Sequence, residues 1–418
     1  VGFASQNFPF HAPTGIAEYH FRPFPQKLGA SLGRTFTPFG GSLNELDLRI
    51  PVIEGHVGIT AGFATADLHN SDESYNKSWG MAFRPFFRFG SVEVVPFVST
   101  AKYTAMYSHP LVVVTGNALP EMPRKRVRYY QTWARGVQRN WHYGSTFKVG
   151  IGDRLSLRAG LFRAEAPKLA NYSELYILSN TGDDRYRVIS DPRQNVHSTS
   201  GEALLSLKLG DGKMQHRVFA GYRARNRYTE TGGSASATHV TPLGDAAHGD
   251  VLAQFERASR AVAPLGTPAA EVNHGRVRQS SLMLGYSGKL PGVLTLNLGL
   301  QKAAYRADSY LAARKAFLPP ERDKPWLYNA TAAFELSPHV SLYAGTEKGL
   351  EDSGIAPENA ANRNEQLPAA RTTQVEGGLR WKFDGGQLVV SAFQITKPFF
   401  AFDAASNYTR QGSVRHRG

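Results

Sequence analysis

Apolar and polar side chains alternate with a period of two along most of this chain, and this pattern restricts the fold more than any other feature. The segment VLTLNLGLQ (293–301) places four leucines on one face of an extended chain and polar or small residues on the other. The same alternation recurs in LNELDLRI (43–50), DRLSLRAGLF (153–162), EALLSLKLG (202–210) and TQVEGGLRWKF (373–383). About 16 such segments can be counted, many of about 10 residues or more, and one helical candidate lies at 250–262. The sequence therefore predicts an all-β fold.

The connections between these segments alternate between short and long. The short turns lie at 152–154, 210–213, 290–292, 337–339 and 384–386. The long connections lie at about 105–137, 167–196, 229–274, 309–323 and 351–370. The strands of a soluble β-sandwich also alternate apolar and polar residues, but that fold gives no reason for short turns on one side and long loops on the other. The pattern predicts a transmembrane antiparallel up-and-down β-barrel with short periplasmic turns and long extracellular loops.

Composition narrows the class of protein further. No stretch approaches the roughly 18 consecutive apolar residues of a membrane-spanning helix, so a membrane protein of this sequence must span with strands. The absence of cysteine excludes a thiolate metal site and a cysteine nucleophile. The formal net charge is +14, but the basic residues are spread over many alternating segments, which argues against a nucleic-acid partner.

Four arginines share one face of the segment MQHRVFAGYRARNRYTE (214–230), and apolar residues share the other. They are Arg217, Arg223, Arg225 and Arg227. On a lipid-facing surface each would cost roughly 2–4 kcal/mol near the membrane midplane, so the arginines should face the lumen. Arg223, Arg225 and Arg227 are candidates for binding an anionic ligand, such as a carboxylate- or catecholate-bearing metal chelate. The alternative, which stays open, is a ladder of arginines paired with acids on neighbouring strands or on a plug.

The loop segment PRKRVRYYQTW (123–133) combines basic and aromatic residues. Tyr129, Tyr130 and Trp133 are candidates for capturing a ligand at the mouth, and a solvated loop or one touching lipopolysaccharide phosphates is the alternative. No HExxH, Walker A or GxSxG motif is present, and the histidines lack ligand-like spacing. We therefore predict no catalytic residue, metal site, cofactor or enzymatic activity.

Four segments resemble the TonB-dependent outer-membrane receptors of the siderophore type. PTGIAEYHFRP (13–23) is similar to the closing strand of their plug domain. LYAGTEKGLEDSGIAPENAANRNEQLPAARTTQVEGGLRW (342–381) resembles their LYxxxSKGL and LPPxRSxQxExGLK region. AFQITKPFFAFD (392–403) resembles the AxFxITK strand that follows, and GSVRHRG (412–418) matches GxxRxRG, which in this family runs on into further strands.

The resemblance implies a monomeric barrel of about 22 strands in the outer membrane of a Gram-negative bacterium, in contact with lipid and lipopolysaccharide. It implies uptake of a scarce ligand, usually a ferric siderophore, driven by TonB acting on an N-terminal box. Residues 1–24 are then the end of the plug and 25–418 a partial barrel, with the TonB box, most of the plug and the last strands outside this sequence. A passive porin is the alternative, and no motif supports an enzyme carried on a barrel.

Overall fold

The computed structural model describes residues 22–71, 73–106, 111–114, 131–178, 185–190, 194–210, 213–232, 239–242, 272–357, 360–362 and 365–418. Most of them belong to one antiparallel sheet of 19 strands, and a separate sheet has four strands. Within these residues, no helix is long and apolar enough to cross a membrane.

Sixteen strands of nine residues or more build the large sheet, in agreement with the number of alternating segments. They are β1 (Gly29–Thr37), β2 (Gly41–Ile53), β3 (Val57–His69), β4 (Tyr75–Phe89), β5 (Val92–Met106), β7 (Gly136–Ile151), β8 (Leu155–Glu165), β12 (Gln194–Leu209), β13 (Gln215–Gly232), β15 (Val272–Leu290), β16 (Leu294–Leu311), β19 (Trp326–Glu335), β20 (Val340–Glu351), β21 (Ala370–Phe383), β22 (Gly386–Phe402) and β23 (Tyr408–Arg417). The short strands β9 (Lys168–Ala170), β17 (Ala316–Phe317) and β18 (Glu321–Asp323) extend the same sheet.

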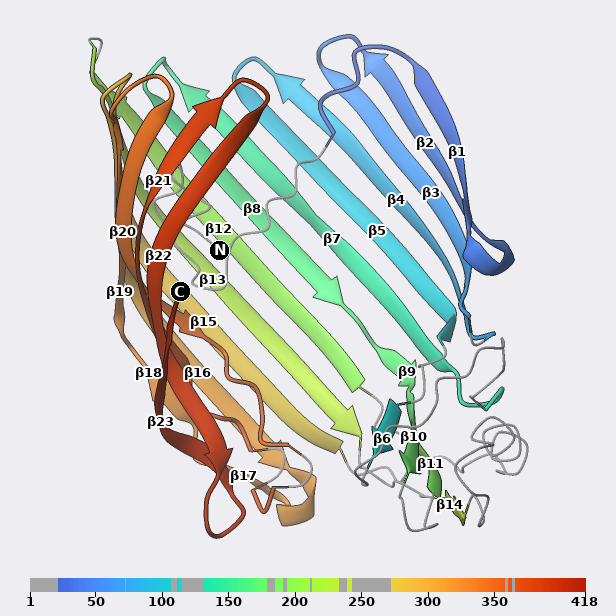
Figure 1. Ribbon diagram of the computed structural model, residues 1–418. Coiled ribbons are helices and arrows are strands. Elements are labelled where there is room, and N and C mark those ends of the chain that lie inside the picture. The colour runs from blue at the N-terminus through green and yellow to red at the C-terminus, as the bar shows by residue number, and fades with distance from the viewer. Residues whose placement is uncertain are drawn as a thin grey trace.

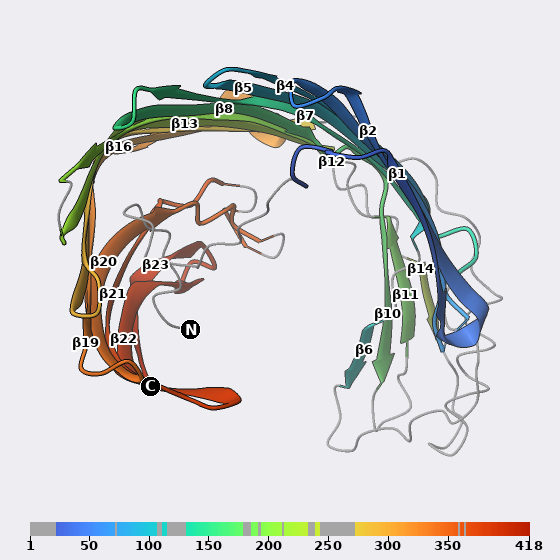
Figure 2. The same ribbon diagram turned by 90° about the horizontal axis from the view of Figure 1, so that it is seen from above.

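Apart from β1 and β23, each long strand pairs with the long strand that precedes it and the one that follows it. β13, for example, is hydrogen-bonded along its length to β12 on one side and to β15 on the other. The result is a curved wall of tilted strands (Figure 1) that is open on one side when seen from above (Figure 2). β1 and β23 form its edges: among the described residues, β1 pairs only with β2 and β23 only with β22.

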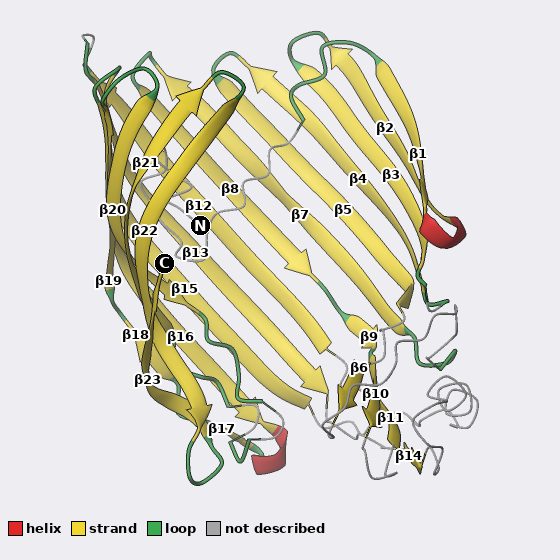
Figure 3. Ribbon diagram, in the orientation of Figure 1, coloured by secondary structure: helices red, strands yellow, loops and turns green. Residues whose placement is uncertain are grey.

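Short turns and long connections lie at opposite rims of the wall (Figure 3). The turns predicted at 152–154 and 384–386 join β7 to β8 and β21 to β22. Gly152 and Gly385 have φ angles of 59° and 82°, in the left-handed region that glycine adopts without a steric cost. The structure thus confirms the predicted barrel topology and the two-sided asymmetry of its connections.

The two faces of the wall differ as the alternation predicts. On the outer face Leu205, Ala220, Leu284 and Leu300 are direct neighbours across four strands. Leu284 is 61% exposed, whereas Met283, on the inner face, is 2% exposed. Since the exposed positions are apolar, the outer face is suited to lipid and the inner face forms the packed side of the wall.

Residues 22–28 lie inside the curve of the wall, against the strands β3 to β5. The Phe24 ring meets the Phe86 ring edge-on at 5.8 Å between centroids. Arg84 Nη2 donates to the Arg22 carbonyl oxygen at 3.0 Å, and Arg84 Nε donates to Thr60 Oγ1 at 3.0 Å. Residues 1–21 lie outside the described part of the chain, so the plug boundary at residue 24 stays a prediction.

The second sheet, here called the loop sheet, consists of four short strands drawn from three long connections at one rim. They are β6 (Leu111–Val114), β10 (Tyr172–Leu178), β11 (Arg185–Ser190) and β14 (His239–Pro242). β10 pairs in parallel with β6 and antiparallel with β11, and β11 pairs with β14. The sequence pattern assigns these stretches to loops, whereas the structure shows that strand pairing links them. The helical candidate at 250–262 lies outside the described residues.

Candidate ligand-binding site

A cavity of ≈ 640 Å³ lies on the inner face of the wall, where β5, β7, β8, β12, β13 and β15 run side by side. Its lining includes Phe97, Phe162, Glu202, Arg223, Arg225 and Gln279. These side chains combine two aromatic rings, one amide group, one acid and two guanidinium groups. The cavity therefore offers apolar contact area together with donors for an anionic ligand.

β13 brings the predicted arginines to this face because its side chains alternate along an unbroken pairing with β12. In the register, Glu202 lies opposite Arg223, Ser200 opposite Arg225, and Ser198 opposite Arg227. Arg223 Nη2 donates to Gln301 Oε1 on β16 at 3.1 Å. Arg223 and Arg225 line the cavity, whereas Arg227 is the next inner-face arginine toward the loop rim.

Arg225 is the arginine of this group that is free to meet a ligand. Its side chain is exposed, and its Nε makes a long hydrogen bond of 3.4 Å to Ser198 Oγ. Within the described part of the chain Arg225 has no acidic partner. Its guanidinium can therefore offer paired donors to a carboxylate or catecholate without first breaking an ion pair.

Arg227 is held by an acid from the connection between β20 and β21. Its Nη1 lies 3.2 Å from Asp352 Oδ2, and Tyr305 OH donates to Asp352 Oδ1 at 3.4 Å. Gln366 Nε2 also donates to Asp352 Oδ1, at 3.0 Å. These contacts fasten the connection between β20 and β21 against the inner face of β13 and β16, and we name its described residues (352–357, 360–362 and 365–369) the inner latch. Figure 2 shows this segment inside the curve of the wall.

Of the predicted aromatic candidates, Trp133 is described and Tyr129 and Tyr130 lie outside the described residues. Trp133 lies beside the loop sheet, in contact with β10. Its Nε1 donates to Gln131 Oε1 at 3.2 Å, and its ring meets Tyr172 edge-on at 5.6 Å between centroids.

The loop sheet contains a buried acid, Glu174, on the same face of β10 as two tyrosines. Glu174 is 2% exposed and accepts hydrogen bonds from the Gln131 backbone N–H, at 3.1 Å to each oxygen, and from Tyr186 OH. Burial raises the pKa of Glu174 to about 7, although both hydrogen bonds favour the charged form. Tyr176 stacks on Tyr186 at 4.6 Å between centroids.

Sequence reasoning missed Glu174, Asp352 and the cavity residues Phe97, Phe162 and Gln279. A signal for Glu174 exists in YSELYIL, where a single acid alternates with aromatic and apolar residues. No local signal marks Asp352, since Arg227 and Tyr305, which it contacts on the wall, lie on distant strands. Among the described residues, no group of three or more histidine or acidic side chains could hold a metal ion.

Comparison with known proteins gives one family match and a set of similar folds. Residues 66–418 match the family model for the TonB-dependent receptor-like β-barrel. No curated protein matches the chain.

Three solved structures illustrate the shared fold. The pyoverdine receptor FpvA of Pseudomonas aeruginosa PAO1 has a TM-score of 0.74 and 16% identity, over 95% of this chain and 58% of that one. BauA, the ferric preacinetobactin receptor of Acinetobacter baumannii, has a TM-score of 0.70 and 19% identity, over 94% of this chain and 58% of that one. Fiu, the ferric-catecholate import receptor of E. coli K12, has a TM-score of 0.72 and 12% identity, over 94% of this chain and 62% of that one. The chain therefore spans less than two thirds of the length of these receptors.

Proposed function

The chain belongs to the TonB-dependent receptor β-barrel family, and from this premise we propose that it serves the TonB-dependent uptake of a ferric siderophore across the outer membrane of a Gram-negative bacterium. The observation that carries the choice of ligand is Arg225, an exposed arginine in a cavity on the inner face. TonB of the inner membrane is the proposed energy-coupling partner, and the receptor acts as a monomer.

An anionic iron chelate fits the chemistry of this cavity. Arg225 provides a planar fork of donors, and Arg223 adds a second positive charge that Glu202 moderates. Phe97 and Phe162 add aromatic surface, on which the flat rings of a catecholate can pack. The three similar receptors named above all carry iron-chelate or siderophore names, which supports the same class of ligand.

Binding measurements with defined chelates test the choice of ligand. The probes are the ferric complexes of a catecholate, a hydroxamate and a carboxylate chelator, titrated against the purified protein by fluorescence quenching. For at least one chelate, Arg225→Gln should weaken binding roughly tenfold, because it removes a charge-assisted hydrogen bond. Arg225→Lys keeps the positive charge but not the paired donors of the guanidinium. Its affinity for the chelate should lie between that of the wild-type protein and that of Arg225→Gln.

Arg217 supplies the matched control, since it lies on the same face of β13 near the opposite rim and outside the cavity. Arg217→Gln should bind the chelate as the wild-type protein does. An equal loss of chelate affinity in the Arg217 and Arg225 variants would contradict the assignment of the cavity as the binding site. Failure of all three chelates to bind would contradict the proposed ligand class.

Uptake assays separate energised transport from the passive porin. Cells that carry the receptor should accumulate the radiolabelled ferric chelate against its gradient. Accumulation should disappear in cells lacking TonB, because only active uptake depends on that partner. Accumulation of the chelate without TonB would instead support the diffusion channel.

A further inference from the structure

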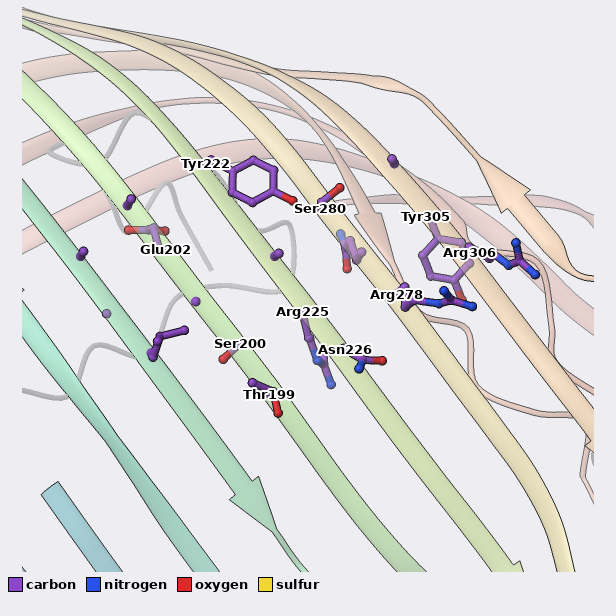
Figure 4. Close-up of a pocket in the computed structure, with 18 of the residues that line it drawn as sticks. Thr199, Ser200, Glu202, Tyr222, Arg225, Asn226, Arg278, Ser280, Tyr305 and Arg306 are labelled. Carbon is purple, nitrogen blue, oxygen red and sulfur yellow. The ribbon is translucent and has the colours of Figure 1, made fainter. Parts of the chain in front are cut away.

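The outer face of the wall carries a hollow of ≈ 1220 Å³ (Figure 4), and part of its lining, including Glu202 and Arg225, also lines the inner cavity. Small side chains form its floor: Gly201, Ala224, Ser280 and Ala304 are direct neighbours across β12, β13, β15 and β16. Because side chains alternate between the two faces, these four lie on the same face as the exposed Leu284. The hollow is therefore open toward the lipid.

Toward the middle of the wall, the hollow borders the apolar band. Tyr222 and Leu282 are direct neighbours on the outer face, and Leu282 is 64% exposed. Next in the same row, Lys302 lies with its Nζ 5.0 Å from the centroid of the Trp326 ring and donates to the Lys324 carbonyl oxygen at 2.7 Å. Aromatic rings and a lysine that reaches toward the rim are typical of the edge of the hydrocarbon layer.

Toward the loop rim, the hollow borders a row of arginines. Arg278 lies directly opposite Arg306, and Arg306 directly opposite Arg322, on three neighbouring strands. Figure 4 shows Arg278 and Arg306 at this edge of the hollow. Like charges placed opposite each other destabilise a sheet unless a counter-charge is near.

The acids of this face compensate only part of the charge. Asp308 lies 2.9 Å from Arg278 Nη2 and 2.7 Å from Arg306 Nη2, so one carboxylate serves two arginines. Among the described residues, Arg322 and Lys324 have no acidic partner. At the far end of the row, Arg163 is paired with Glu165 at 2.7 Å. An excess of positive charge therefore remains around the hollow.

We propose that this hollow binds the phosphate groups of a lipopolysaccharide-type glycolipid of the outer leaflet, with the acyl chains lying along the apolar band at Leu282 and Leu284. In this family the long loops face outward, so the arginine row lies at the level of the outer-leaflet headgroups. Arginine forks match phosphate oxygens bidentately, and the small floor residues leave room for a bulky headgroup. The proposal rests on the outer-face arginines and does not depend on the proposed function.

Native mass spectrometry of the full chain, purified in detergent and titrated with lipopolysaccharide, tests this site. The triple variant Arg278→Gln, Arg306→Gln, Arg322→Gln should lose at least about tenfold in affinity, because each change removes charge-assisted bonds to phosphate. The corresponding triple lysine variant keeps the charge and should retain part of the binding, which shows that the wall still folds. Lipopolysaccharide with its phosphates removed should bind the wild-type protein as weakly as native lipopolysaccharide binds the glutamine variant.

Two control variants separate this site from general charge effects. Lys77 is an outer-face cation on β4 near the same rim, and it is paired with Asp67 at 3.3 Å. Lys77→Gln should bind lipopolysaccharide with the affinity of the wild-type protein. Arg217→Gln, on the inner face and outside the hollow, should also bind lipopolysaccharide as the wild-type protein does. Unchanged lipid binding in the triple glutamine variant would overturn the proposal, as would equal binding of phosphatidylglycerol and lipopolysaccharide.

Discussion

Replacing Glu174 with glutamine should remove a pH dependence from the loop sheet. Glu174 lies between Tyr186 OH and the Gln131 backbone N–H, and it is almost fully buried. Burial raises the pKa of Glu174 to about 7 from an ordinary 4.5. Glutamine has a similar shape and keeps a carbonyl acceptor, but it carries no charge at any pH.

The sign and size of the effect follow from linkage. Because the pKa is raised in the folded sheet, the folded state holds a proton between pH 4.5 and 7 that the unfolded state has lost. The stabilisation is complete below pH 4.5, decreases as the pH rises, and is gone above about pH 7. At roughly 1.4 kcal/mol per pH unit, the difference amounts to about 3 kcal/mol.

Amide hydrogen exchange measures this local stability. After correction for intrinsic exchange rates, protection in β10 and β11 should fall roughly 100-fold between pH 4.5 and 8, whereas β13 should change little. Glu174→Gln should flatten the profile. Glu165→Gln, which neutralises a half-buried acid on β8 outside the loop sheet, should leave the pH profile of β10 and β11 unchanged. A flat profile in the wild-type protein, or the same slope in the Glu174 variant, would refute the reasoning.

Three further predictions follow from the wall. Asp352→Asn removes the counter-charge of Arg227 and should loosen the inner latch by about 1 kcal/mol or less, seen as faster amide exchange at 365–369. Leu284→Arg on the lipid face should cost roughly 2–4 kcal/mol in urea titrations of folding into vesicles, clearly more than Leu284→Ala. Residues 1–418 alone should give no steady single-channel conductance, because among the described residues β1 pairs only with β2 and β23 only with β22, and unpaired strand edges are costly in lipid. Unchanged exchange, equal costs of the two substitutions, or a stable unitary pore would contradict the respective prediction.

The strands and their faces could be predicted because the period of two is a local property. Leu282 and Leu284 alternate with Ser281 and Met283, and the structure places the leucines outward and the other two inward. The short turns could be predicted for the same reason, since glycine in the left-handed region marks them within a few residues.

Contacts between distant segments could not be predicted in this way. Arg227 and Asp352 are 125 residues apart, and their pairing depends on how the inner latch folds back against β13. The loop sheet joins strands of four to seven residues from three connections, and the β6–β10 pairing is parallel. Short strands of this kind carry too little alternation to be distinguished from loops, and nothing in their sequences names a partner.

The arginines show what alternation decides and what it leaves undecided. Alternation alone places Arg223 and Arg225 in the lumen, because a charge on the lipid face is costly near the midplane. The same reasoning would count Arg278 and Arg306 as misplaced, since both share a face with Leu284. The cost of a lipid-facing charge falls to near zero at the membrane interface, so depth along the strand matters as much as the face. Depth follows from the register across several strands, which places these arginines beyond the apolar band and makes their position compatible with binding a headgroup.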